Sequence, residues 1–133
     1  MSSSGKLLSR CVVIFMTLLC VSLISSPAQA TTKDDAKAYA QSYMQTKYGW
    51  DTKQFACASS VFNYESHWNY KDKNSKYLGI PQVNAGFVRS QGYSKQQFMS
   101  DYKIQIRVGL TYIKKRYGTP CKAASHIHQN GWY

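Results

Sequence analysis

The sequence predicts a small, mainly α-helical domain with about five short helices and one disulfide. Apolar residues recur at helical spacing in several segments, residues that cap helices flank these segments, and two cysteines stand far apart after residue 30. The length of 133 residues suits one domain, and no repeat or Pro/Gly-rich linker divides residues 31 to 133. We therefore expect one folded unit.

Residues 1 to 30 have the pattern of a signal peptide. Lys6 and Arg10 precede the uncharged apolar run 11–25, and Ala28 and Ala30 place small residues where a signal peptidase reads them. The run is short for a membrane span, so an uncleaved anchor is the less favoured alternative. We expect residues 31 to 133 to be secreted, with no stable membrane insertion after cleavage.

The secreted part is strongly basic and retains two cysteines, Cys57 and Cys121. It has 15 Lys and Arg against six Asp and Glu, a net charge of +9, because Lys6 and Arg10 leave with the signal. Two cysteines in an exported chain predict one disulfide, and no CxxC or His-Cys spacing supports a metal site instead. Closing a loop of 64 residues would stabilise the fold by about 4 kcal/mol in the chain-entropy model.

The first two predicted helices cover residues 33 to 48 and about 52 to 66. Thr32 is the expected N-cap of the first helix, and Gly49 ends it. Asp51 with Gln54 resembles a capping box that opens the second, which should end near Ser66. The apolar residues at helical spacing are Ala36, Tyr39, Ala40, Tyr43 and Met44 in the first helix, and Phe55, Ala58, Val61 and Phe62 in the second.

Three further helices are predicted after a polar turn at residues 71–76 and a Gly/Pro-containing stretch at 79–82 that is unable to continue a helix. Ser94 with Gln97 caps a short helix at about 95–99. An amphipathic helix spans about 102–117, and Gly118 with Pro120 ends it. A last helix at about 122–128 would be joined by the disulfide to the second helix.

Glu65 is the only glutamate, and it is the candidate catalytic residue. It is the only formally charged side chain from residue 54 to 70, and its helical spacing with Ala58, Val61 and Phe62 places it on the apolar face near the helix end. Burial and the C-terminal helix dipole both raise a carboxyl pKa, as the general acid of glycosidic cleavage requires. The ordinary alternative is a glutamate that faces solvent or bonds a backbone amide.

Several short stretches, in order along residues 48 to 133, match one known family. They are Tyr48-Gly49-Trp50, Glu65-Ser66 with Trp68-Asn69, Gly79-Ile80-Pro81-Gln82, Gln105-Ile106, Gly109-Leu110, Tyr112-Ile113, Arg116-Tyr117-Gly118 with Pro120-Cys121, and Gly131-Trp132-Tyr133. In these stretches the chain resembles the lysozyme-like, transglycosylase-type domain of secreted Gram-positive cell-wall proteins, including the aggregation-promoting-factor group. The resemblance implies a lysozyme-like domain over residues 31–133, with an N-terminal helix at 31–48 and a family-like core at 49–133.

The resemblance also implies residue roles. Glu65 would be the acid/base, Ser66 would orient it, and Gln82 would line the saccharide cleft and bind substrate groups. Tyr70 and Tyr77 are candidates to stack on sugar rings, with a core role as the alternative, whereas Trp68 is expected to pack in part. No cofactor is implied.

Three histidines and two aspartates leave alternatives open. His67 stands where the family usually has a small residue, commonly Gly, and His128 where it tends to have Gln. A zinc site from His67, His126 and His128 is disfavoured because His126 and His128 are two residues apart on a helix and point apart. Asp72 and Asp101 are the candidates for a second carboxylate of a hydrolase, and the predicted turn and N-cap explain both without catalysis. A single glutamate suffices for a lytic transglycosylase, which the chain resembles.

The net charge of +9 predicts a polyanionic partner. For an exported Gram-positive protein this is peptidoglycan with its anionic wall polymers, so the protein would be extracellular or associated with the cell wall. Nucleic acid is the competing polyanion, but we expect no nucleic-acid partner, because no recognised binding motif is present and the secretion signal removes most opportunities for contact. We expect a monomeric peptidoglycan-cleaving enzyme. The alternatives are a non-catalytic wall-binding or aggregation factor and, less favoured, a cationic antimicrobial protein.

Overall fold

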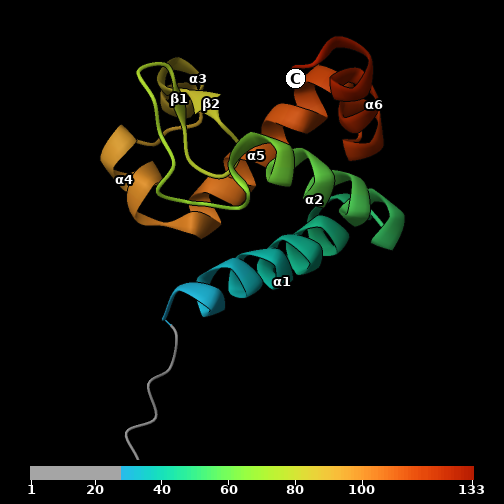
Figure 1. Cartoon of the computed structure of the whole chain (residues 1–133), viewed down its shortest axis with the longest axis horizontal. Coiled ribbons are helices and arrows are strands. Elements are labelled where there is room, and N and C mark those ends of the chain that lie inside the picture. Colours follow the sequence, from blue (N-terminus) through green and yellow to red (C-terminus); the bar gives the residue numbers. More distant parts are fainter. Residues whose placement is uncertain (1–27) are drawn as a thin grey trace, which may run out of the picture.

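The computed structural model describes residues 28–133, with side chains from Thr32 onward. All but the last three residues of the predicted signal peptide lie outside the described residues. Between residues 28 and 133 the chain forms six helices and one short hairpin (Figure 1). These are α1 (Ala28–Tyr48), α2 (Thr52–Ser66), β1 (Tyr77–Leu78), β2 (Val83–Asn84), α3 (Ala85–Ser90), α4 (Lys95–Ser100), α5 (Tyr102–Tyr117) and α6 (Pro120–Asn130). The predicted mainly α class with one disulfide is confirmed.

Two cores form on either side of α5. We call α1, α2 and α6 the first lobe, and the hairpin with α3 and α4 the second lobe; Figure 1 shows the hairpin, α3 and α4 gathered at one end of the molecule. The core of the first lobe consists of Ala36, Ala40, Met44, Trp50, Ala58, Val61, Phe62, Trp68, Ile80 and Ala123, completed by Ile106, Leu110 and Ile113 of α5. The core of the second lobe consists of Leu78, Val83, Val88 and Phe98, completed by Val108 of α5.

The predicted caps are formed at most of the helix ends. Asp51 accepts a hydrogen bond from the backbone nitrogen of Gln54, and Ser94 and Gln97 form a full capping box. Asp101 caps α5 by accepting from the backbone nitrogen of Lys103 at 2.7 Å. Gly118 ends α5 with a φ of 85°. With Asp101 at its start and Gly118 at its end, α5 has the predicted bounds of residues 102 to 117.

Two helix starts differ from the prediction, and helix α3 and the hairpin were missed. The helix predicted from Lys33 begins at Ala28, so Thr32 is inside it and is not its N-cap; the residues before Thr32 include alanines, which favour a helix. Pro120 is the first residue of α6, because Thr119 caps that helix and proline is well tolerated in a first turn. Helix α3 and the hairpin were not predicted, since six and two residues are too few for a hydrophobic period to emerge.

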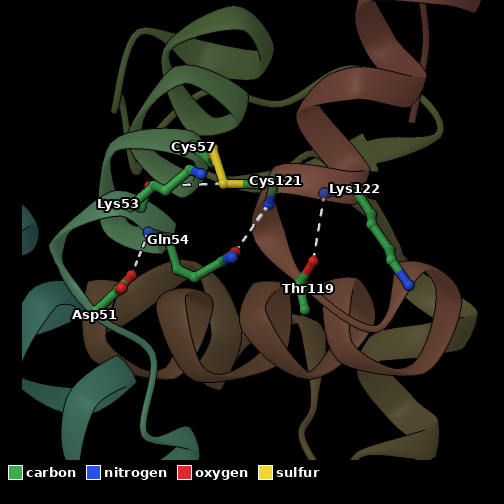
Figure 2. The surroundings of a disulfide bond; sticks show 7 residues. All are labelled: Asp51, Lys53, Gln54, Cys57, Thr119, Cys121 and Lys122. Carbon is green, nitrogen blue, oxygen red and sulfur yellow. Dashed lines mark hydrogen bonds between the residues drawn. A yellow bond between two sulfur atoms is a disulfide. The ribbon is translucent and has the colours of Figure 1, made fainter.

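The predicted disulfide joins α2 to α6. Cys57 and Cys121 are bonded, with their Cα atoms 4.9 Å apart (Figure 2). The side chain of Gln54, predicted to complete a capping box with Asp51, instead accepts a hydrogen bond from the backbone nitrogen of Cys121 at 3.0 Å. A covalent bond and a hydrogen bond therefore fasten the start of α6 against the first turns of α2 (Figure 2).

Candidate functional site

Glu65 lies in the last turn of α2, where the carboxyl is half-buried. Ala58, Val61 and Phe62 of the same face are fully buried, as their spacing with Glu65 predicts. Burial raises the pKa of Glu65 from 4.5 to about 7. The carboxyl is thus partly protonated at neutral pH and able to donate a proton, which confirms the predicted direction of the shift.

The end of α2 is held by an unusual turn. His67 and Trp68 both have positive φ angles, 52° and 60°, and the backbone nitrogen of His67 closes the helix on the Asn63 carbonyl. Left-handed backbone costs more for a residue with a Cβ than for glycine, so glycine would be the favoured residue at position 67. The His67 side chain is exposed. The turn fixes the direction in which the chain leaves Glu65.

Ser66 connects this helix end to the segment 79–82. Its side chain is buried at 4% exposure, and its hydroxyl donates to the Ile80 carbonyl oxygen at 2.8 Å. The hydroxyl therefore acts on the backbone beside Glu65, and the roles of Ser66 in orienting Glu65 and in substrate binding stay predictions.

The segment 79–82 is seated on α5 by Gln105 and Gly109. Gln105 is fully buried; its side-chain oxygen accepts from the Ile80 nitrogen at 2.8 Å, and its amide nitrogen donates to the carbonyls of Tyr70 and Phe98. A Cβ on Gly109 would lie 2.5 Å from the Pro81 Cβ, so only glycine lets the segment approach α5 this closely. The end of α2, the segment 79–82 and α5, which are tens of residues apart in the sequence, thus meet next to Glu65.

Gln82 folds back on the turn that precedes it. It adopts a φ of 47°, and its amide nitrogen donates to the carbonyls of Gly79 at 2.8 Å and Asp72 at 3.3 Å. These bonds close the hairpin turn. The side chain is half-buried, and its role in substrate binding stays a prediction.

The aromatic candidates fall into different environments. Trp68 is buried at 2% and packs edge-on against Phe62, as a core residue does. Tyr70 is half-buried against the core of the first lobe. Tyr77 is 47% exposed on β1, and Tyr64 is 55% exposed with its hydroxyl donating to the Gly131 carbonyl at 2.8 Å. Tyr77 and Tyr64 are therefore the aromatic side chains of this group that a ligand can reach most easily.

Tyr117 and Tyr133 complete the surroundings of Glu65, and the sequence assigned no role to either. The Tyr133 hydroxyl donates to the Pro81 carbonyl, and its ring stacks on Tyr117 at 6.2 Å. Burial raises the pKa of Tyr133 well above its usual value, and the charge of Glu65 raises it further. Figure 1 shows the C-terminal end of the chain between α6 and the hairpin. The sequence signal available for the two tyrosines is their place in the short stretches Arg116-Tyr117-Gly118 and Gly131-Trp132-Tyr133.

The two aspartates have the structural roles that the sequence suggested. Asp101 caps α5. Burial lowers the pKa of the nearby Arg107, but Tyr39, Tyr93 and the negative charge of Asp101 raise it, and the net shift is upward. The backbone of Asp72 belongs to the turn, where its carbonyl accepts from Gly79 and Gln82. Neither is paired with Glu65.

The histidines do not gather into a metal site. Over the described residues, no group of three or more His, Cys, Asp or Glu side chains could hold a metal ion. His126 instead interacts with Asn130 and with the rings of Tyr117 and Trp132, and His128 is exposed. Among the helices from residue 28 onward, none is long and apolar enough to cross a membrane.

In comparisons with known families, curated proteins and solved structures, no family model, protein or structure matches this chain significantly.

Proposed function

We propose that this protein is a secreted peptidoglycan-cleaving enzyme of the lytic transglycosylase or muramidase type. It would act on the glycosidic bond between N-acetylmuramic acid and N-acetylglucosamine, with Glu65 as its single acid/base. The observation that carries the proposal is the partly desolvated Glu65 carboxyl in the last turn of α2, whose pKa burial raises to about 7. The resemblance of residues 48 to 133 to the transglycosylase-type domain supports it.

In the proposed reaction Glu65 works first as an acid and then as a base. The protonated carboxyl donates its proton to the glycosidic oxygen, which leaves as the hydroxyl of the departing sugar. The carboxylate then accepts the proton of the substrate's own 6-hydroxyl, whose oxygen bonds to the anomeric carbon and gives a 1,6-anhydro end. Burial helps both steps because a pKa near 7 lets the group exchange a proton in either direction.

The test is digestion of purified peptidoglycan by residues 31–133. Glu65→Gln keeps the shape of the side chain and is expected to abolish release of soluble muropeptides, at least 100-fold, with fold and wall binding retained. Asp72→Asn is the matched control and should keep most of the activity, because Asp72 is part of a turn. Release by the Glu65→Gln protein at the normal rate would refute the proposal. Mass spectrometry separates an anhydro end from a hydrolysed one by the mass of one water.

A second candidate, a non-catalytic factor that binds or aggregates walls, is favoured by the exposed positive charge. Of the 15 Lys and Arg side chains between residues 32 and 133, 13 are exposed. Such a surface binds polyanions and weakens as salt screens it. Under this alternative, wall binding survives Glu65→Gln, is lost at high salt, and occurs without any cleaved product.

A further inference from the structure

Arg116 lies in the last turn of α5 with its guanidinium held by aromatic rings. The guanidinium carbon is 5.1 Å from the ring centre of Trp132 and 5.7 Å from those of Tyr112 and Tyr117. One of its terminal nitrogens donates to the Tyr112 hydroxyl at 2.7 Å. The residue is exposed. These contacts restrain the flexible side chain and leave the planar cation available to solvent.

Trp132 is fixed in a half-exposed position beside Arg116. It is 50% exposed, whereas Trp50 and Trp68 are buried at 8% and 2%. The His126 ring packs edge-on against it with centroids 4.5 Å apart. A large ring that is held in place and still open to solvent offers a flat apolar surface of the kind on which a sugar ring can lie.

The cluster that Arg116 forms with Tyr112, Tyr117, Trp132 and His126 borders the Glu65 site. Tyr117 belongs to the cluster, and its ring stacks on Tyr133. The Tyr133 hydroxyl donates a hydrogen bond to the carbonyl of Pro81, in the segment 79–82 that Ser66 contacts next to Glu65. Burial raises the pKa of the Tyr117 hydroxyl, the positive charge of the nearby Arg116 lowers it, and the negative charge of Glu65 raises it. A glycan bound at Glu65 could thus extend over Trp132 and Arg116.

We propose that Arg116 and Trp132 form a subsite for a sugar that carries a carboxylate. The guanidinium pairs with the carboxylate through two parallel N–H donors, and the exposed part of the Trp132 ring contacts the sugar. The subsite rests on the proposed function, because it assigns a part of the same substrate. The Arg116–Trp132 subsite makes the protein bind carboxylated glycan more tightly than neutral chitin-type glycan. The carboxylate can come from the lactyl ether of the sugar or from an attached peptide.

The test measures binding of three matched ligands to the Glu65→Gln protein, so that no cleavage disturbs the titration. The ligands are neutral N,N′-diacetylchitobiose, the disaccharide of N-acetylglucosamine and N-acetylmuramic acid with its free lactyl carboxylate, and the same disaccharide bearing an L-Ala-D-Glu peptide. Dissociation constants come from NMR titration, with the indole N–H signal of Trp132 as the local reporter. We expect at least one carboxylated ligand to bind about 10-fold more tightly than chitobiose. The tighter of the two identifies the source of the carboxylate.

Substitutions assign this preference to Arg116. Arg116→Gln should remove it and leave chitobiose affinity unchanged, and Arg116→Lys should lose most of it because lysine has no planar fork. Arg89→Gln, which removes an exposed guanidinium from α3, is the matched control and should keep the preference. Thermal melting verifies that each variant is folded. Equal affinity for neutral and carboxylated ligands, or a preference that survives Arg116→Gln, overturns the inference.

The two proposals fail separately. A protein that cleaves peptidoglycan with no carboxylate preference refutes the subsite alone. A protein that keeps the preference and never cleaves refutes the proposed enzyme and leaves the Arg116 subsite in place as a binding site.

Discussion

The two lobes on either side of α5 are built differently. Among the described residues, 13 buried side chains make the core of the first lobe and five make that of the second. The first lobe has helices of 21, 15 and 11 residues and contains the disulfide, whereas the second has two six-residue helices and strands of two residues. Elements as short as those of the second lobe are not stable alone, so they depend on packing against α5.

Glu65 lies where the two lobes meet. It is at the end of a long helix of the first lobe, and the segment 79–82 beside it is the turn of the hairpin in the second lobe. Gln105 of α5 fastens this turn and α4, because it bonds Ile80 in the turn and Phe98 in α4, and it also bonds the carbonyl of Tyr70 in the loop after α2. Glu65 therefore lies on the lobe with the longer helices and the disulfide, next to a turn of the lobe whose short elements depend on packing against α5.

The largest expected effect follows from removing the disulfide. The double substitution of Cys57 and Cys121 by serine should lower the free energy of unfolding by about 4 kcal/mol, since the unfolded chain regains the entropy of a 64-residue loop. Urea unfolding of the oxidised and variant proteins measures this. Hydrogen exchange should show the largest loss of protection in α6. A loss below about 1 kcal/mol would mean that the noncovalent contacts of the first lobe already hold α6.

A somewhat smaller effect is expected for Gln105→Met, which breaks the hydrogen bonds that fasten the hairpin turn and α4 to α5. The substitution keeps the size of the side chain but leaves the Ile80 nitrogen and the Tyr70 and Phe98 carbonyls without their partner. We expect a loss of about 3 kcal/mol in the free energy of unfolding.

The matched control for Gln105→Met is Gln129→Met on the exposed surface of α6. It should change stability by less than about 0.5 kcal/mol. Hydrogen exchange in the Gln105→Met protein should rise more in α4 than in α1. Equal increases in both would contradict the picture of a second lobe that depends on the hydrogen bonds of Gln105.

The smallest effect concerns the pH dependence that Glu65 adds to the stability of the first lobe. Burial raises its pKa from 4.5 to about 7, so the folded chain holds this proton more tightly than the unfolded chain. The contribution of Glu65 is thus most favourable below pH 4.5 and is lost as the pH rises toward 7.

Glu65→Gln removes this penalty. It should raise the free energy of unfolding at pH 8 by on the order of 1–2 kcal/mol, discounted from the full shift because the carboxyl is only half-buried, and change it little at pH 4. Urea unfolding at both pH values measures the difference. A gain of equal size at pH 4 and pH 8 would show that the carboxyl is not desolvated.

Much of the first lobe could be predicted from residues close together in the sequence. The spacing of Ala36, Ala40 and Met44 gave the buried face of α1, and Asp51 and Gly118 marked helix ends that the structure retains. The second lobe was largely missed, because α3 and the hairpin have too few residues for a periodic pattern and are defined by their contacts. The direction of the pKa shift of Glu65 was predicted, since it followed from the apolar face of one helix.

The sequence by itself determined the helical class, the pairing of Cys57 with Cys121 and the singular position of Glu65, because each depends on local spacing or on a small number of residues of one type. Only the tertiary structure decided that Tyr133 closes over Pro81 and that Gln54 bonds Cys121 instead of its own helix cap. Such contacts join residues more than 50 positions apart, and their free energy appears only when the whole chain has folded around α5.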